Sequence, residues 1–218
     1  MTASDSVAQP TRVLVLAKAP QPGRVKTRLI PVLGPAGAAM LARQMLAQTL
    51  QTALAAGLEA VELCMSPAPN DAAWQGVDIP VSVLCSAQGE GDLGQRMARA
   101  VTRVTLEHQQ AVLLIGTDCP DLTAQHLKQA AQALRHHDAV LLGACDGGYV
   151  LLGLKAPCPS IFTDMPWSTP VVATQTLQRL AAQGLRVWQG PVLHDIDEPA
   201  DLQQLPLFLQ KNLHKNML

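Results

Sequence analysis

A short segment near the N-terminus of the chain gathers positively charged side chains. Residues 18–28 read K-A-P-Q-P-G-R-V-K-T-R and hold four of the sixteen Lys and Arg residues. These cations are Lys18, Arg24, Lys26 and Arg28. Gly23 lets the backbone approach a ligand closely, so amides and cations together suit a diphosphate. The segment lacks the G-x-x-x-x-G-K-[ST] spacing of a Walker loop, and a basic loop that only faces solvent is the alternative.

Two acidic segments offer oxygen ligands for a divalent cation. Asp118 and Asp121 follow the apolar run 111–115, and Asp195 and Asp197 alternate near the C-terminus. Mg²⁺ or Mn²⁺ typically takes one or two carboxylates together with phosphate oxygens of the substrate. If the two segments lie close together in the fold, Asp118 and one of the later pair could share the metal. Alternatively, Asp121 stabilises the start of the following helix, and Asp197 caps the last one.

A third segment, D-G-G-Y at residues 146–149, combines a carboxylate and a phenol with two flexible glycines. Both polar groups can hydrogen-bond the hydroxyls of a sugar, and Asp146 is also a candidate general base. A tight turn between two strands is the alternative. In the later P-W-S-T segment, Trp167 can cover a pocket or fill the edge of the core, while Ser168 is also a candidate helix cap. The candidate pocket residues are Asp146, Gly147, Gly148, Tyr149, Trp167 and Ser168.

The composition excludes several classes of protein. The formal net charge is −1 and aromatic residues make up 3% of the chain, so neither a basic field nor a stacking platform for nucleic acid is available. No run approaches the roughly 18 apolar residues of a membrane span, and the polar leader at residues 1–11 has no hydrophobic signal region. The five cysteines lack C-x-x-C spacing. We therefore expect a cytoplasmic protein that binds neither nucleic acid nor a membrane.

Hydrophobic periodicity predicts alternating strands and helices along residues 12–218, which indicates a single α/β domain. Strands are expected at residues 12–17, 61–65, 81–85, 111–115, 139–143, 149–154 and 185–188. Helices are expected at residues 35–56, 93–106, 123–136 and 169–183. About seven strands with helices on both faces would form a mostly parallel sheet. Ligands bind beyond the carboxyl ends of such strands, where the basic, acidic and D-G-G-Y segments are expected to lie.

Six short motifs follow one another in the chain. They occupy residues 17–29, 88–97, 115–122, 146–154, 166–169 and 195–202. In this order they resemble a bacterial family of GT-A-type glycosyltransferase-like proteins, often labelled radical-SAM/selenodomain-associated transferases. The resemblance implies a Rossmann-like GT-A fold of the nucleotide-diphospho-sugar transferase superfamily, which binds a nucleotide and Mg²⁺ or Mn²⁺. It also implies that the four cations of residues 18–28 contact phosphate and that Asp118 with Asp195 or Asp197 holds the metal.

The first loop is also similar to that of the guanylyltransferase that activates phospholactate, in which a short basic segment binds the phosphates of the nucleotide. The chain departs from the family at Glu198, where Thr is usual, and keeps both neighbouring aspartates.

These motifs favour a metal-dependent transferase that uses a nucleotide-diphospho-sugar, with Asp118, Lys26 and Asp146 as candidate catalytic residues. The metal and the basic loop would stabilise the departing diphosphate. One alternative is a nucleotidyltransferase that joins a nucleoside triphosphate to a phosphorylated small molecule and releases pyrophosphate. Another is a nucleotide-binding accessory protein without turnover. For either enzyme the partners are a nucleotide or nucleotide-sugar and a small-molecule acceptor, and the sequence leaves the oligomeric state open.

Overall fold

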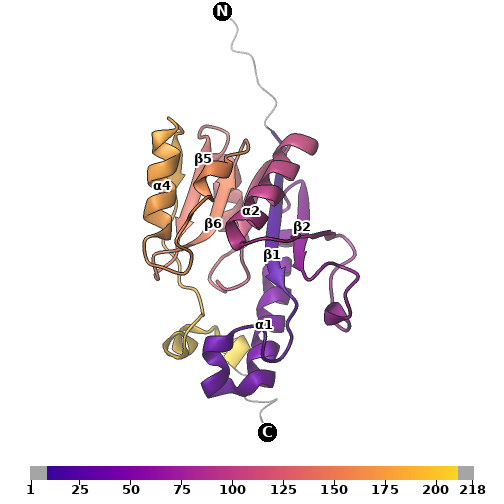
Figure 1. Cartoon of the computed structure of the whole chain (residues 1–218). Coiled ribbons are helices and arrows are strands. Elements are labelled where there is room, and N and C mark those ends of the chain that lie inside the picture. The colour runs from indigo at the N-terminus through magenta and orange to yellow at the C-terminus, as the bar shows by residue number, and fades with distance from the viewer. Residues whose placement is uncertain (1–8, 211–218) are drawn as a thin grey trace, which may run out of the picture.

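One sheet organises the chain. The computed structural model describes residues 9–210, and its seven strands lie in the order β3-β2-β1-β4-β6-β5-β7 (Figure 1). The strands are β1 (Thr11–Lys18), β2 (Ala60–Ser66), β3 (Leu84–Ala87), β4 (Ala111–Ile115), β5 (Ala139–Gly143), β6 (Tyr149–Leu154) and β7 (Val187–Gln189). Only β6 is antiparallel to its neighbours within the described residues. The predicted α/β fold with a mostly parallel sheet is therefore confirmed, while residues 1–8 of the expected leader and residues 211–218 of the expected domain lie outside the described part.

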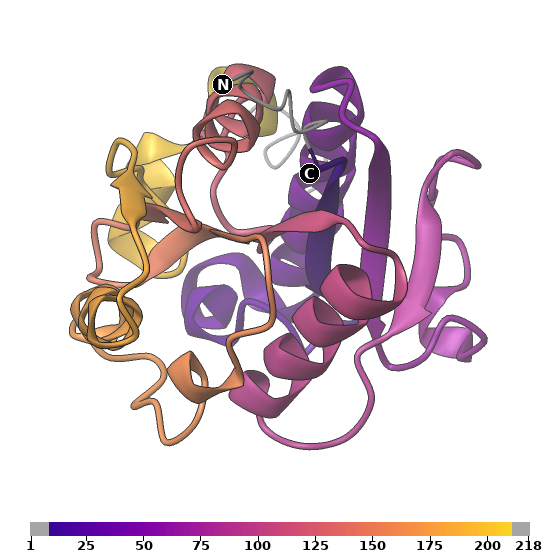
Figure 2. The same ribbon diagram turned by 90° about the horizontal axis from the view of Figure 1, so that it is seen from above.

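Helices cover both faces of the sheet. The α-helices are α1 (Ile30–Ala55), α2 (Leu93–Thr102), α3 (Ala124–Ala133) and α4 (Val172–Ala182). Leu50 of α1 and Leu127 of α3 belong to the buried cluster on one face, and Met97 of α2 and Leu180 of α4 belong to the cluster on the other (Figure 2). All five residues of β4 are buried between these layers. Burial on both faces explains why the central strands are continuous apolar runs.

The longest helix begins earlier than predicted and is broken near its start. α1 begins at Ile30 instead of residue 35, and Gly34 interrupts it with φ 68° and ψ 166° before Pro35. The helical stretch Thr27–Ala55 is also long and apolar enough to cross a membrane, with a mean hydropathy of 1.3. This is weak support for a membrane span, because a core helix passes the same test and α1 packs against the sheet through residues such as Leu50.

Several other boundaries differ from the prediction. The third strand lies at Leu84–Ala87 instead of 81–85, because Val83 N donates to Pro80 O at 2.9 Å in a turn that leaves Val81 exposed. The seventh strand lies at Val187–Gln189 instead of 185–188, and α4 begins at Val172 instead of residue 169. α2 ends at Thr102 instead of residue 106, and one π-helical turn, Arg103–Glu107, follows it. The local apolar pattern continues past these ends, which are set by pairing and turns within the fold.

A buried carboxylate, Glu62 of β2, joins the sheet to the end of α2. Its Oε2 accepts a hydrogen bond from Arg12 Nη1 at 2.6 Å, and its Oε1 accepts from Ser86 Oγ at 2.5 Å and from Arg103. Only 2% of the Glu62 side chain is exposed. Burial by itself raises the pKa of Glu62, but the hydrogen bonds from these three donors outweigh it and hold the pKa below its ordinary value.

Replacing Glu62 by alanine leaves the guanidinium of Arg12 buried without its carboxylate. We expect Glu62→Ala to lower the free energy of unfolding by about 3–5 kcal/mol, as measured by urea denaturation at neutral pH. Because the folded pKa lies below the ordinary value of 4.5, the stability that depends on the Glu62 charge is present above about pH 4.5. This stability is lost as the pH falls through the folded pKa. The difference in free energy of unfolding between the wild type and Glu62→Ala should therefore become smaller below pH 4.5.

Glu59 provides a matched control because it is an exposed glutamate just before the same strand. We expect Glu59→Ala to change the free energy of unfolding by no more than about 0.5 kcal/mol. Equal losses in the two variants would contradict a specific role for the buried cluster.

Candidate functional site

Loops that are far apart in the sequence meet at the carboxyl end of the sheet. Leu193 N donates to Gly143 O at 3.0 Å, beyond the end of β5. Ile196 N donates to Asp118 O at 2.8 Å, beyond the end of β4. These backbone hydrogen bonds hold residues 193–196 across the ends of two strands, so the two predicted acidic segments are brought together.

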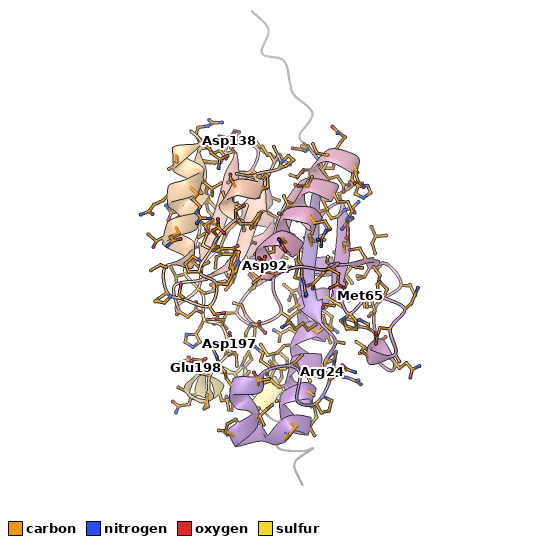
Figure 3. The ribbon with its side chains drawn as sticks, in the orientation of Figure 1. Arg24, Met65, Asp92, Asp138, Asp197 and Glu198 are labelled. Atoms are coloured by element: carbon orange, nitrogen blue, oxygen red, sulfur yellow. The ribbon has the colours of Figure 1, made fainter. Side chains whose placement is uncertain are left out.

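Figure 3 shows where this end of the sheet lies. Arg24, Asp197 and Glu198 are found at one end of the molecule, and Asp138, at the start of β5, lies at the other. The basic loop after β1 and the second acidic segment therefore share one edge, as predicted from the order of the strands.

Lys26 lies at the centre of this edge. Its Nζ is 2.5 Å from Asp118 Oδ1, 2.9 Å from Asp197 Oδ1 and 2.5 Å from the backbone oxygen of Ile196. These contacts use all three protons of the ammonium group. The backbone of Lys26 is left-handed, with φ 47° and ψ 42°, at the start of the short helix η1 (Thr27–Leu29). The side chain that was predicted to contact phosphate is thus held by two carboxylates and one carbonyl.

Lys26 is buried and charged at the same time. Only 6% of its side chain is exposed, whereas Asp118 and Asp197 are 48% and 40% exposed. Burial alone lowers the pKa of Lys26, but the charges of Asp118 and Asp197 outweigh burial and raise it above its ordinary value. The ammonium therefore stays protonated, and it faces the protein interior while its two carboxylate partners face solvent.

Asp195 adds a third carboxylate to the cluster. Partial burial and the negative charges of Asp146, Asp197 and Asp118 together raise its pKa to about 6. Three of the other candidate acidic residues therefore act electrostatically on Asp195. Asp121 is exposed beside the start of α3.

The chemistry of these side chains suits a divalent cation, but their arrangement is not that of a ready metal site. Carboxylate oxygens are the preferred ligands of Mg²⁺ and Mn²⁺, and the crowding around Asp195 would be relieved by a cation. Within residues 9–210, however, no group of three or more acidic, His or Cys side chains is placed to bind one ion. The position between Asp118 and Asp197 is taken by the Lys26 ammonium.

The other predicted phosphate-binding residues are exposed at the same edge. Lys18, Arg24 and Arg28 all face solvent, and Arg28 Nη1 lies 3.6 Å from Glu198 Oε1. Gly23 has φ 77°, and no atom lies within 4 Å of the position that a Cβ would take. This loop leaves room for a ligand to approach its backbone closely.

The D-G-G-Y segment forms a tight turn that is fixed to α4. Asp146 Oδ1 accepts from Gly148 N at 2.7 Å, and Ala173 N donates to Gly147 O at 2.9 Å. The Tyr149 hydroxyl lies 3.9 Å from Met97 Sδ, and burial raises the pKa of Tyr149. The phenol is therefore directed at α2 in this structure, while Asp146 itself is exposed.

Two predicted helix caps are wrong. The last short helix, η5 (Pro199–Gln204), is capped by Glu198 instead of Asp197. The backbone N of Asp197 and that of Glu198 both donate to Asp201 Oδ2. α4 has no side-chain cap. Ser168 is exposed and Trp167 packs against the cluster formed by α2 and α4. Because Glu198 caps η5, the Asp197 carboxylate pairs with Lys26 instead.

The loop after β3 is a part of this edge for which no site residue was predicted. Gln88 is buried, and its Nε2 donates to Ala17 O at 3.0 Å and to Cys64 O at 2.9 Å, which ties the ends of β1 and β2 together. Gly89 and Gly91 follow with φ 74° and 105°. The spacing of these two glycines in Q-G-E-G was the available signal, because such backbone angles favour glycine.

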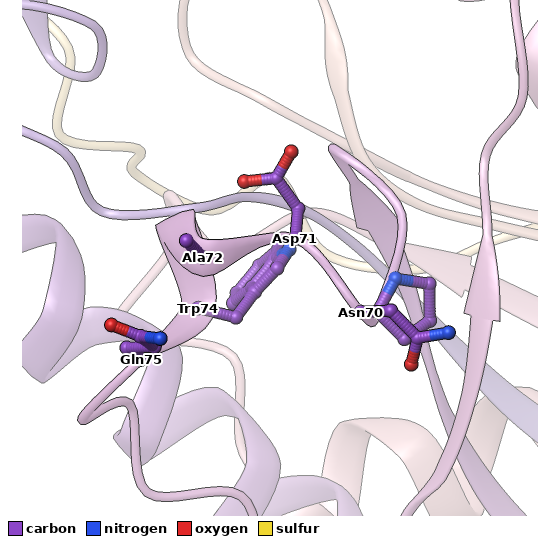
Figure 4. Close-up of a pocket in the computed structure, with 6 residues that line it drawn as sticks. Asn70, Asp71, Ala72, Trp74 and Gln75 are labelled. Atoms are coloured by element: carbon purple, nitrogen blue, oxygen red, sulfur yellow. The ribbon is translucent and has the colours of Figure 1, made fainter.

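An open pocket lies in the loop after β2 (Figure 4). It is lined by Pro69, Asn70, Asp71, Ala72, Trp74 and Gln75. Asp71 accepts from Ala73 N at 2.8 Å, and Trp74 Nε1 donates to Pro67 O at 2.9 Å. Because its acid and its indole already serve the loop, this pocket adds no chemistry to the site.

The turn at Gly147 is expected to tolerate no side chain. Gly147 has φ 89°, and a Cβ there would lie 2.1 Å from Pro170 O. We expect Gly147→Ala to lower the free energy of unfolding by more than about 3 kcal/mol, because the clash adds to the backbone strain. Gly184→Ala is the control, since Gly184 has φ 72° with open space around it, and about 1–2 kcal/mol is expected. Similar losses in urea denaturation would contradict the close approach to Pro170.

A solved structure from Desulfovibrio desulfuricans G20, assigned provisionally to the nucleotide-diphospho-sugar transferases, is 33% identical to the chain. The match covers 86% of this chain and 82% of the other, with a TM-score of 0.78. The fold is therefore the predicted one of the nucleotide-diphospho-sugar transferases.

More distant structures share the fold alone. Rv0371c from Mycobacterium tuberculosis H37Rv, in complex with manganese, is 17% identical over 91% of this chain and 98% of the other, with a TM-score of 0.53. CMP:2-keto-3-deoxy-manno-octonic acid synthetase, in complex with CTP, is 12% identical over 93% and 99%, with a TM-score of 0.54.

A comparison with curated proteins gives no match. Residues 49–169 match the model of the family described as uncharacterized protein conserved in bacteria (DUF2064). This segment covers more than half of the chain and includes the loops after β3 and β4 and the D-G-G-Y turn. The chain therefore belongs to the DUF2064 family, with the fold of the nucleotide-diphospho-sugar transferases.

Proposed function

We propose that the protein is a metal-dependent transferase that acts on a nucleotide-diphospho-sugar. The observation that carries this proposal is the meeting of Asp118, Asp195 and Asp197 with the exposed cations of the first loop at one edge of the sheet. Carboxylates suit Mg²⁺ or Mn²⁺, and cations beside them suit a diphosphate. The relative from Desulfovibrio desulfuricans G20, provisionally assigned to this class, supports the same reaction type.

Each group of residues has a role in this proposal. Asp118 with Asp195 or Asp197 would hold the metal, which supplies charge neutralisation at the departing diphosphate. Lys18, Arg24, Lys26 and Arg28, with the backbone at Gly23, would bind the phosphates. Manganese bound to the distant Rv0371c supports the choice of cation.

The turn at residues 146–149 would face the sugar or the acceptor. Asp146 Oδ1 accepts a hydrogen bond from Gly148, so Oδ2 is the oxygen that would receive a hydroxyl proton or a hydrogen bond from the sugar. Gly147 and Gly148 would let backbone come close to the ligand, while Tyr149, Trp167 and Ser168 would border the pocket.

A second candidate is nucleotidyl transfer from a nucleoside triphosphate to a phosphorylated small molecule. Four cations within residues 18–28 suit the larger charge of a triphosphate. The fold shared with a synthetase that was crystallised with CTP also favours nucleotidyl transfer. The two reactions differ in their leaving group, which is a nucleoside diphosphate in the first and pyrophosphate in the second.

Titration calorimetry with nucleoside triphosphates and nucleotide-sugars, with and without Mn²⁺, tests both candidates. We expect binding of a nucleotide-sugar that depends on Mn²⁺ and, in turnover assays, release of a nucleoside diphosphate. Pyrophosphate released from a triphosphate would favour nucleotidyl transfer, and binding without turnover would favour an accessory protein. Failure to bind either class, or nucleotide binding that is unchanged in Asp118→Ala, would contradict the proposed site.

Arg24 tests the role of the basic loop. We expect Arg24→Ala to weaken nucleotide binding about tenfold, because one charge-assisted hydrogen bond to phosphate is lost. The affinity of this variant should also depend less on salt than that of the wild type. Lys128→Ala on α3 removes an exposed cation elsewhere and should leave the affinity unchanged. Equal effects of the two substitutions would show that only net charge matters.

A further inference from the structure

The Lys26 ammonium occupies the position that a shared divalent cation would take. Nζ contacts Oδ1 of Asp118 at 2.5 Å and Oδ1 of Asp197 at 2.9 Å. Mg²⁺ binds carboxylate oxygens at about 2.0–2.1 Å, so an ion that bridges these two oxygens on the side of Nζ would overlap the ammonium. Contact and charge repulsion forbid both cations at once. On that side of the carboxylates, the metal and the ammonium can only exchange.

The structure holds Lys26 in place before any ligand arrives. The side chain is 6% exposed, and the Ile196 carbonyl supplies a third partner at 2.5 Å. The amide of the same residue, Ile196, donates to the backbone oxygen of Asp118. The ammonium therefore neutralises the two carboxylates and also joins the basic loop to the second acidic segment.

The two carboxylates are open to solvent, whereas the ammonium between them is buried. Asp118 and Asp197 are about half exposed, so a solvated ion can reach their oxygens, whereas the Lys26 side chain that contacts them is buried. The exposed cations Arg24 and Arg28 lie on the same loop as Lys26. A displaced ammonium would thus move among the residues that are proposed to bind phosphate.

We propose that Lys26 is an internal competitor of the divalent cation: the metal binds between Asp118 and Asp197 by displacing the ammonium, which becomes accessible. This rests on the metal dependence of the proposed function. Without metal, Lys26 keeps the carboxylates paired and the edge closed to loosely bound ions. With metal, its charge is available to a second ligand, so metal and nucleotide binding would favour each other.

The affinity for Mn²⁺ alone, without nucleotide, tests the competition. We expect Lys26→Met to bind Mn²⁺ at least about tenfold more tightly than the wild type, because no ammonium has to leave. Lys18→Met is the matched control: it removes an exposed cation of the same loop, and its affinity should rise less than threefold. Calorimetry or the electron paramagnetic resonance signal of free Mn²⁺ measures both. An unchanged or weaker affinity in Lys26→Met would overturn the proposal, as would equal gains in the two variants.

A second measurement uses the unaltered protein and decides the matter if Lys26→Met does not fold. Lysine labelling by an amine-reactive ester, read by mass spectrometry, should find Lys26 protected without metal and labelled with saturating Mn²⁺. Lys128 is the internal reference, because it is exposed in both cases. A Lys26 side chain that stays protected while Mn²⁺ is bound would overturn the proposal. An absence of Mn²⁺ binding in both the wild type and Lys26→Met would also overturn it.

The two proposals can fail separately. Mn²⁺ binding that displaces Lys26 without any nucleotide binding would contradict the proposed transferase function and support the proposed competition between Lys26 and the metal. Mn²⁺-dependent nucleotide turnover with Lys26 always protected would keep the transferase and refute the competition.

Discussion

The contact on which the site depends is the one between the Lys26 ammonium and the carboxylates of Asp118 and Asp197. It joins residues that are 171 positions apart in the chain and closes the carboxyl edge of the sheet. A buried cation is costly unless it is fully paired, and here three acceptors satisfy its three protons. Because the pairing is complete, the loop after β1 can hold its backbone in a left-handed conformation at Lys26.

A second buried ion cluster shows how differently the same chemistry can be used. Around Glu62 the carboxylate is 2% exposed and two arginines enclose it, so the negative charge is withdrawn from solvent. Around Lys26 the cation is enclosed and its carboxylate partners are about half exposed. The first arrangement only joins the sheet to α2. The second presents paired carboxylates to anything that reaches the edge from outside.

The sheet order explains why the edge can be built at all. β1 and β4 are parallel neighbours, so the loops after Lys18 and Ile115 leave the sheet side by side. The antiparallel β6 lies between β4 and β5, and the segment from Leu193 to Ile196 crosses from the end of β5 to Asp118. The partial burial and the neighbouring carboxylates that raise the pKa of Asp195 are a result of this crossing.

The amino-acid sequence by itself determined the class of fold and the segments that follow the carboxyl ends of its strands. Continuous apolar runs mark buried strands, and the carboxyl ends of parallel strands share one edge. Only the tertiary structure decided that β6 runs antiparallel, that the third strand starts at Leu84, and that Lys26 faces carboxylates instead of solvent. These features depend on strand pairing and on contacts across more than 150 residues, as between Lys26 and Ile196, and local spacing carries no record of such contacts.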